Sequence, residues 1–375
     1  MSLTYAIEHN IKVGAGDHIK CLAFSSKDTH IAAGIGSSVY IWELPNANLT
    51  LNSPIGSPVT VLKWFGENLL LAGSLGGALV MYEMETSKKL VNVSIVAMPG
   101  STITHLAFSP NMRKLVVGGG HTVTAWARQR PTKDNLCFQW KYHTVLPDPI
   151  AGGNHLELKA EVSGLHFLDN EQVVICYRQQ YGIRLYNFKT GKVSQCGIPH
   201  DAPIDAIFIT PDGSRVMTPN HQSGFNVYDM QSGGHYHHFA LHAQESHSPL
   251  PGTFIHAGTV LVGGYNNEIA MWHVGSKHRL PSVEVNGAEL IVSNRAAEIG
   301  DDGETPLRLA VATTSSFTIL RAEQIGTDAS RRVSTLSLLL ENYTDELVLV
   351  VIVLGIVGVC HWQSVRLPEL WSLSV

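Results

Sequence analysis

The chain has 375 residues, of which 44% are hydrophobic and 15% are charged, so it can bury a sizeable folded core. Its formal net charge is −5 and it has no basic block, which argues against binding to nucleic-acid phosphate. The N-terminus, MSLTYAIEHN, lacks the basic start and apolar stretch of a secretory signal. Five scattered cysteines without a CxxC pair fit reduced cytosolic thiols better than a disulfide framework: Cys21, Cys137, Cys176, Cys196 and Cys360.

One four-residue strand pattern, apolar–x–apolar–large, recurs seven times along the chain. Its copies end at Trp42, Tyr82, Trp126, Tyr186, Tyr228, Trp272 and Leu320. Successive end residues are 40, 44, 60, 42, 44 and 48 positions apart. Because the repeat of a β-propeller blade is about 40–45 residues long, this period predicts seven blades.

A second strand precedes six of these copies at a nearly constant distance. It ends at Phe24, Trp64, Phe108, Phe167, Ile209 and Ile255, which lie 18, 18, 18, 19, 19 and 17 residues before the following copy. Between the two strands lies a third, at residues 30–34, 68–73, 114–119, 172–177, 215–219, 259–264 and 307–313. These third strands are continuously apolar, which predicts burial on both faces.

Small residues and turn residues agree with this assignment. Gly34, Gly73, Gly119 and Gly264 end four of the third strands, where they leave room for bulky side chains of a neighbouring blade. Turn residues, such as Pro211–Gly213, separate consecutive strands. A β-sandwich is the alternative, but it has no reason to repeat every forty residues. We therefore expect an all-β, seven-bladed propeller of four-stranded antiparallel blades.

These features resemble the WD-repeat family over about residues 5–323. The family's terminal Trp-Asp pair survives in part, since Asp229 follows Tyr228, whereas other copies are followed by Glu43, Glu83, Ala127, Asn187, His273 and Arg321. Its Gly-His element is reduced to Asp17–His18 and His200–Asp201. The resemblance implies that few blades keep the family's His–Asp hydrogen bonds. It also implies that an N-terminal strand completes the last blade, and residues 4–7 fit that part.

Two long connections interrupt the period. One lies within residues 127–160 and contains the segment 148–155, and the other is the acidic stretch 298–305. Long loops on a rigid scaffold often bind partners, but tolerated surface insertions are commoner. Both interpretations stay open for each loop.

A hydrophobic segment near the C-terminus predicts a transmembrane helix. Leu347–Val365 contains no charged residue and would span roughly 28 Å as a helix. A buried helix or a final strand is the alternative, but the apolar run is too long for a blade strand. The expected organisation is a propeller at 1–323, a linker at 324–345, a transmembrane helix at 346–365 and a tail at 366–375. Export and lipid-anchor signals are missing from the sequence.

Because this segment is made last, we expect a tail-anchored protein whose propeller faces the cytosol. Arg331 and Arg332, on the N-terminal side of the segment, agree with that orientation. An endomembrane is favoured over the plasma membrane.

The sequence assigns no catalytic, cofactor-binding or metal-binding residue. No phosphate-binding loop, HExxH or GxSxG motif is present. Histidines gather at residues 235–247, and His235 and His237 would share one face of a strand and could bind zinc or copper. An exposed outer strand whose imidazoles face water is the favoured alternative, because the spacing gives no complete ligand set.

Three functions are compatible with this sequence. The favoured one is a non-enzymatic scaffold whose loops bind a protein or peptide at a membrane. The second is a small-GTPase regulator, because the layout resembles the membrane-bound exchange factor that starts coat assembly at the endoplasmic reticulum. The third is a propeller hydrolase with carboxylates in its channel, for which Asp205 is one of few candidates. Neither a nucleic acid nor a small-molecule substrate is expected.

The orientation can be tested by adding protease to intact membranes that contain the full-length chain. We expect the propeller to be digested, because a tail-anchored protein exposes its N-terminal domain to the cytosol. Immunoblotting for an N-terminal tag measures this, with a protein of the organelle lumen as the protected control. Full protection of the propeller would contradict the predicted topology.

Overall fold

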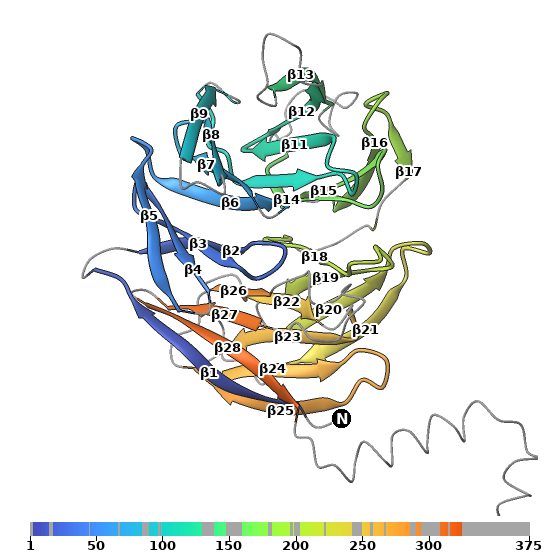
Figure 1. Cartoon of the computed structure of the whole chain (residues 1–375). Helices are drawn as coiled ribbons and strands as arrows, with labels where there is room; N and C mark the ends of the chain where they lie inside the picture. Colours follow the sequence, from blue (N-terminus) through green and yellow to red (C-terminus); the bar gives the residue numbers. More distant parts are fainter. Residues whose placement is uncertain are drawn as a thin grey trace, which may run out of the picture. The chain divides into compact units, whose positions relative to one another are not determined.

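In the computed structural model, seven four-stranded antiparallel sheets follow one another around a central axis as the blades of a β-propeller (Figure 1). Tyr5–Glu323 form one compact unit. The structure describes residues 3–324 except 15–17, 45, 67, 85–89, 97, 99, 130–138, 148–159, 179–181, 196–197, 199–202, 221–222, 242–249, 256–257, 266–267, 286–289, 294–307 and 314–315.

Each blade is a meander whose first strand is innermost. Blade 1 contains β2 (Ile19–Phe24), β3 (His30–Ile35), β4 (Ser38–Glu43) and β5 (Asn48–Pro54). Blade 2 contains β6 (Val59–Phe65), β7 (Leu69–Ser74), β8 (Ala78–Met84) and β9 (Leu90–Val96). Blade 3 contains β10 (His105–Phe108), β11 (Lys114–Gly119), β12 (Thr122–Gln129) and β13 (Gln139–Leu146). Blade 4 contains β14 (Val162–Phe167), β15 (Gln172–Tyr177), β16 (Ile183–Asn187) and β17 (Val193–Gln195).

The remaining three blades complete the ring. Blade 5 contains β18 (Phe208–Ile209), β19 (Arg215–Asn220), β20 (Gly224–Asp229) and β21 (His235–Ala240). Blade 6 contains β22 (Gly252–Ile255), β23 (Val260–Tyr265), β24 (Glu268–His273) and β25 (Arg279–Glu284). Blade 7 contains β26 (Leu290–Ser293), β27 (Arg308–Ala312), β28 (Ser316–Gln324) and, outermost, β1 (Leu3–Lys12).

All of the strands expected from the repeat are present, and the fold prediction is confirmed. Three innermost strands begin later than the pattern predicts: β10 and β22 begin two residues late, and β18 is limited to Phe208–Ile209 where a strand over 204–209 was expected. For β18, the reason is that the backbone N–H of Ile204 donates to the carbonyl of Arg178 in blade 4, at 3.0 Å. Those first residues therefore connect two blades and do not pair with β19.

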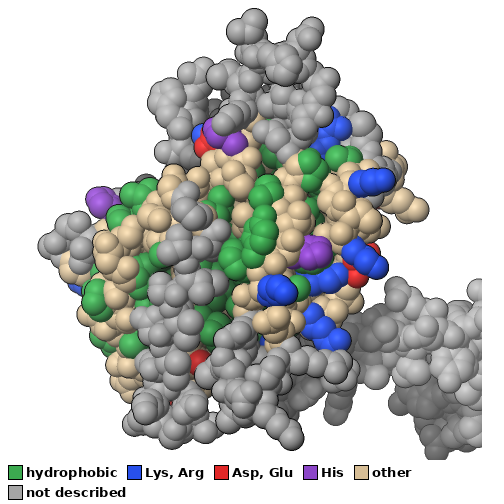
Figure 2. Space-filling model, turned by 90° about the horizontal axis from the view of Figure 1, so that it is seen from above, with side chains coloured by type: hydrophobic (Ala, Val, Ile, Leu, Met, Phe, Trp, Pro, Cys, Tyr) green, Lys and Arg blue, Asp and Glu red, His purple; other side chains and the backbone are tan. Residues whose placement is uncertain are grey.

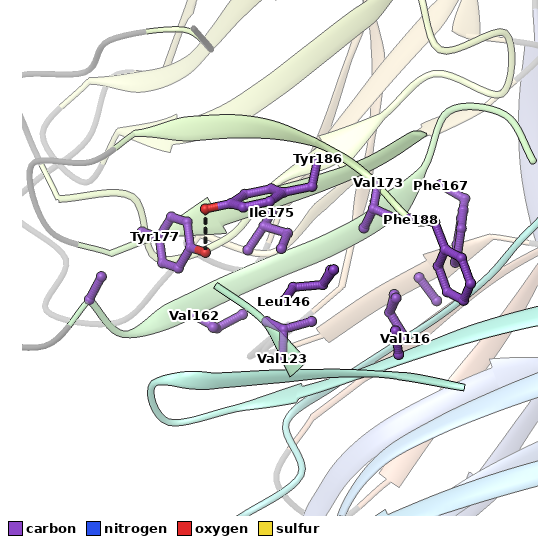
Figure 3. Close-up of a cluster of buried hydrophobic side chains, with 13 residues drawn as sticks. Val116, Val123, Leu146, Val162, Phe167, Val173, Ile175, Tyr177, Tyr186 and Phe188 are labelled. Carbon is purple, nitrogen blue, oxygen red and sulfur yellow. Dashed lines mark hydrogen bonds between the residues drawn. The ribbon is translucent and has the colours of Figure 1, made fainter. Parts of the chain in front are cut away.

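Hydrophobic side chains on the two faces of each middle strand hold the blades together. In β15, Val173 and Ile175 pack toward blade 3, and Val174 and Cys176 pack toward blade 5. Figure 3 shows the cluster between blades 3 and 4, in which the hydroxyls of Tyr177 and Tyr186 are 3.1 Å apart. The continuously apolar strands of the sequence are the second strands from the centre of the blades, and they are buried on both faces, as predicted.

Close approach of neighbouring blades requires glycine at defined positions. A Cβ atom on Gly34 would lie 2.6 Å from Val59 of blade 2, and one on Gly73 would lie 2.6 Å from Ile103, which leads into blade 3. Both glycines therefore make room for the next blade, as the sequence predicts. In blade 3 this role belongs to Gly118, which contacts Leu165 of blade 4, whereas Gly119 lies against the backbone of Thr102.

The N-terminal strand closes the ring. β1 lies beside β28 and completes blade 7, as residues 4–7 were expected to do (Figure 1). On β27, Arg308 donates from Nε and Nη2 to the carboxylate of Glu8 on β1, at 2.6 and 2.8 Å. Its Nη1 lies 3.5 Å from Asp28 in the first turn of blade 1. One buried guanidinium thus links β1, blade 7 and blade 1.

The residue after the repeated four-residue pattern caps a turn in three blades. Asp229 accepts hydrogen bonds from the backbone N–H groups of Gln231 and Ser232, at 3.1 and 2.7 Å. Asn187 accepts equivalent bonds from residues 189 and 190, and His273 Nδ1 accepts one from Ser276. The position that holds Asp in the WD-repeat pattern therefore stabilises the turn into the outermost strand.

Several predicted features lie outside the described residues. They are the loop segment 148–155, the acidic stretch 298–305, Asp17, His200–Asp201 and the transmembrane segment 346–365. In the part of the chain that the structure describes, no helix is long and apolar enough to span a bilayer.

Replacing Arg308 with methionine should destabilise the propeller by about 3 kcal/mol, because Glu8 and Asp28 would keep buried negative charges without their cation. Urea unfolding of the full-length chain at neutral pH measures this. The hydrogen bond from Arg308 holds the pKa of Glu8 below its ordinary value, against the effect of burial.

The same ion pair gives a pH dependence whose sign follows from the lowered pKa of Glu8. The carboxylate stabilises the folded state above about pH 5, and this contribution is lost as the pH falls through the folded-state pKa. The gap in unfolding free energy between wild type and Glu8→Gln should therefore narrow on acidification. Glu43→Gln, at an exposed strand position, is the matched control. A gap that narrows no more for Glu8→Gln than for Glu43→Gln would contradict the role of this pair.

Candidate functional site

A cavity of about 570 Å³ lies where the innermost strands of blades 1 to 6 meet around the central axis. It opens on the face where these strands end and turn into the second strand of each blade. The lining residues are Leu22, Ala23, Phe24, Ser25, Ser26, Leu62, Lys63, Trp64, Gly66, Leu106, Ala107, Phe108, Ser109, Pro110, Met112, Leu165, His166, Phe208, Gly252 and Thr253. Most of the lining is therefore apolar, with a few polar groups, as in ligand-binding cavities.

Trp64 forms a fixed part of the wall. Its indole Nε1 donates to the carbonyl oxygen of Ala23 at 3.0 Å, which joins blade 2 to blade 1 at the mouth of the cavity. The ring also stacks on His30, with 6.0 Å between centroids, and only 8% of the residue is exposed. The hydrogen bond satisfies the indole N–H, so the aromatic surface can stay in place without a buried, unpaired donor.

A second aromatic group supports the neighbouring part of the wall. Phe108 packs edge-on against Phe65, with 4.8 Å between ring centroids, and Trp140 lies 5.9 Å from both rings. The guanidinium of Arg128 lies 5.1 Å from the centroid of Phe65. These contacts join blades 2 and 3 directly behind the cavity and fix the position of Phe108.

The polar groups of the lining differ in their roles. The hydroxyls of Ser25 and Ser109 accept hydrogen bonds from the backbone N–H groups of His30 and Lys114, each at 3.0 Å, and so close two equivalent turns. Lys63 and His166 supply an ammonium group and an imidazole. Among the lining residues that the structure describes, none is acidic. The cavity therefore combines an apolar wall with cationic character.

Lys63 and His166 occupy the same place in two repeats. In the strand register, the equivalent residues of the other blades are Ala23, Ala107, Phe208 and Thr253. The sequence analysis did not single out Lys63 and His166. Aligning the innermost strands column by column would have found them, because they are the two basic side chains in a column that otherwise holds alanine, phenylalanine and threonine.

Asp205, the candidate for a channel carboxylate, takes part in an ion-pair cluster instead. Its Oδ1 accepts a hydrogen bond from Arg178 Nε at 2.6 Å, and Arg178 Nη1 lies 3.3 Å from Glu161. Glu161 directly precedes β14, Arg178 directly follows β15 within blade 4, and Asp205 lies in the connection to β18 of blade 5. Asp205 does not line the cavity. The cluster ties two neighbouring blades together.

The histidine cluster lies on β21, the outermost strand of blade 5. His238 Nδ1 lies 2.8 Å from Asn226 Oδ1, and its Nε2 lies 3.2 Å from the carbonyl of Ser223, so both ring nitrogens have protein partners. The ring of His235 packs against Tyr228, and that of His237 against Phe239. His242 and His247 lie outside the described residues. Within the described ranges, no three His, Cys, Asp or Glu side chains are close enough to share a metal ion.

Buried ionisable groups near the channel are held in their neutral forms. Cys21 and Cys176 are free and buried, and burial raises the pKa of each thiol to about 12. Burial also lowers the pKa of His105 to about 4, and its Nδ1 lies 2.7 Å from the hydroxyl of Thr104. All three side chains are therefore uncharged at neutral pH, and each is a poor candidate for a reactive group.

The outer rim offers a different, flatter surface. Figure 2 views the molecule from the side on which β13 lies in Figure 1, and hydrophobic side chains there are flanked by lysine and arginine. Tyr142 and Val145 on β13 and Val193 on β17 are about half exposed, at 49%, 47% and 47%. Tyr142 also packs edge-on against Trp126.

Comparison with known proteins adds no relative: no protein-family model matches the chain, and no curated protein matches it.

The histidine cluster should not form a specific metal site, because His238 is already engaged at both ring nitrogens. Calorimetric titration of the full-length chain with Zn²⁺, and separately with Cu²⁺, should give the same weak heats for wild type and for the His235→Gln/His237→Gln double variant. His121→Gln, in a turn of blade 3, is the matched control. A one-to-one site of micromolar affinity that disappears only in the double variant would show that the histidines bind metal.

Proposed function

We propose that this chain is a membrane-anchored, non-enzymatic interaction scaffold of the WD-repeat type, whose propeller binds a segment of a partner protein in the channel cavity. The observation that carries the proposal is the convergence of six blades on one largely apolar cavity with fixed aromatic walls. No single blade could form this cavity, so it depends on the closed ring. A rigid concave surface of this size suits the insertion of side chains from a partner.

Three features support membership of the WD-repeat type. The four-residue strand pattern occurs seven times, and each copy lies on the strand next to the outermost one of its blade. Bulges recur at the same position of the innermost strand in blades 1, 2 and 4, between Ile19 and Cys21, Val59 and Val61, and Val162 and Gly164. The residue directly after the four-residue pattern, which caps a turn, is Asp229 in blade 5. Degenerate copies of one repeat account for all three.

The membrane anchor rests on the sequence of Leu347–Val365, which is long and apolar enough to span a bilayer as a helix. β28, the last described strand, runs toward the face on which the cavity opens. The linker at 325–345 contains 21 residues (345 − 324) and would reach up to about 70 Å if extended. A partner could therefore reach the cavity while the chain is anchored.

Membrane anchoring is tested by fractionating cells that express the tagged full-length chain or a chain truncated after Ser330. We expect the full-length chain in the membrane pellet, resistant to extraction with alkaline carbonate, and the truncated chain in the supernatant, because the truncation removes the apolar segment. The location of the full-length chain by microscopy also tests the choice of an endomembrane. Equal recovery of both chains in the supernatant would overturn the anchoring.

The scaffold role is tested by proximity labelling and cross-linking in cells that express the full-length chain. Phe24→Ala removes an aromatic side chain from the cavity rim and should reduce the recovery of specific partners severalfold. Val193→Ala removes an exposed apolar side chain from the outer rim, outside the cavity, and is the control. Partner recovery that is identical for both variants and wild type would count against the cavity as the binding site.

A further inference from the structure

We infer that the channel cavity selects an acidic peptide segment in which a large apolar side chain lies next to an aspartate or glutamate. This inference rests on the proposed scaffold function and adds to it the chemistry of the partner. It depends on the apolar wall, on the position of Lys63 and His166, and on the lack of acidic side chains in the described lining.

The apolar part of the lining provides the first contact for such a segment. Phe24, Trp64 and Phe108 come from three successive blades, and each ends, or nearly ends, its innermost strand. They therefore surround the mouth of the cavity at the same height along the axis. An aromatic or branched aliphatic side chain entering there would be removed from water on several sides, which contributes roughly 1.5–3 kcal/mol of burial for a Leu or Phe side chain.

The basic side chains of the lining favour a partner segment with negative charge. Lys63 in blade 2 and His166 in blade 4 stand at equivalent positions, on either side of blade 3. Blade 3, which lies between them, has the short side chain of Ala107 at that position. A carboxylate that enters the cavity can accept a hydrogen bond from either basic group, whereas a lysine or arginine of a partner would meet like charge.

The cavity needs little rearrangement before it can bind. Trp64 is held by its hydrogen bond to Ala23, and Phe108 by its contacts with Phe65 and Trp140. The hydroxyls of Ser25 and Ser109 are used inside their own turns, where they also accept backbone N–H groups. Since these groups are already fixed, binding does not have to order them, which favours affinity.

The chemistry favours a peptide over a nucleic acid. Lys63 is the only lysine or arginine among the described lining residues, and the chain as a whole carries a net charge of −5. One ammonium group can pair with one carboxylate, but it cannot neutralise a run of phosphates. The apolar walls also have nothing to gain from a phosphate backbone.

The experiment is a selection of random dodecapeptides displayed on phage against the full-length chain in detergent micelles. We expect enriched sequences to contain Phe, Leu, Ile or Met next to Asp or Glu. The best peptide, made synthetically and labelled with a fluorophore, should bind the wild-type chain and lose about tenfold or more in affinity with Lys63→Glu. Added salt should weaken the wild-type affinity.

Two further variants make the result specific. Lys63→Met keeps most of the aliphatic stem and removes only the charge, so it should reduce affinity for the acidic peptide without altering the melting temperature. Lys189→Glu makes the same charge reversal at an exposed position outside the cavity, on a turn of blade 4, and should change affinity less than twofold.

Each outcome has a definite meaning. Acidic, apolar peptides whose binding falls with Lys63→Glu and Lys63→Met, but not with Lys189→Glu, support the inference. Neutral or basic peptides that bind and are lost with Phe24→Ala would overturn the predicted charge and leave the scaffold function standing. Peptides whose affinity is unchanged by substitution of either Lys63 or Phe24 would overturn both the inference and the cavity as the binding site. A selection that enriches no peptide would overturn both as well.

Discussion

β1 lies beside β28 and supplies the outermost strand of a blade whose other three strands come from the opposite end of the propeller sequence. This pairing removes two free strand edges at once and commits the N-terminal residues to the last blade. Arg308 reinforces it by joining β27 to Glu8 on β1 and to Asp28 in blade 1. The cavity depends on this closure, because six blades can line one channel only when the first and the last of the seven are neighbours.

Closure also explains why the inner strands tolerate different side chains at one position. The middle strands pack on both faces, so changes there alter the fit between blades, as the contact of Gly118 with Leu165 illustrates. The innermost strands border the channel instead, and Lys63 and His166 occupy half-buried positions in its wall. A polar group at a half-buried position loses less of its hydration than one on a fully buried middle strand, so it costs less free energy there.

The sequence was sufficient to predict the number of blades, nearly all strand positions and the closing strand, because each depends on a period and on burial. It did not predict that β18 is short, since the hydrogen bond between Ile204 and Arg178 joins two blades and leaves no trace in a strand pattern. It predicted that Gly119 makes room for the next blade, whereas Gly118 does so. The error is one residue, and neighbouring residues of a strand face opposite sides of the sheet. The cavity was missed for a related reason: its walls come from six segments far apart in the sequence, and each contributes between one and six residues.

A propeller of identical blades would have a channel of sevenfold symmetry, with the same side chain repeated around the axis, and such a channel could not fix the rotation of a bound peptide about that axis. Specificity in this fold must therefore come from departures from the repeat. A departure from the repeat indicates specificity only where the fold does not require the consensus residue. At the position after the four-residue pattern, Asp229, Asn187 and His273 all cap turns, so variation there preserves a structural role. In the column that contains Lys63 and His166, an ammonium group in blade 2 and an imidazole in blade 4, among alanine, phenylalanine and threonine elsewhere, break the symmetry of the channel in charge and in size at the same height, which is what the recognition of one oriented, acidic segment requires.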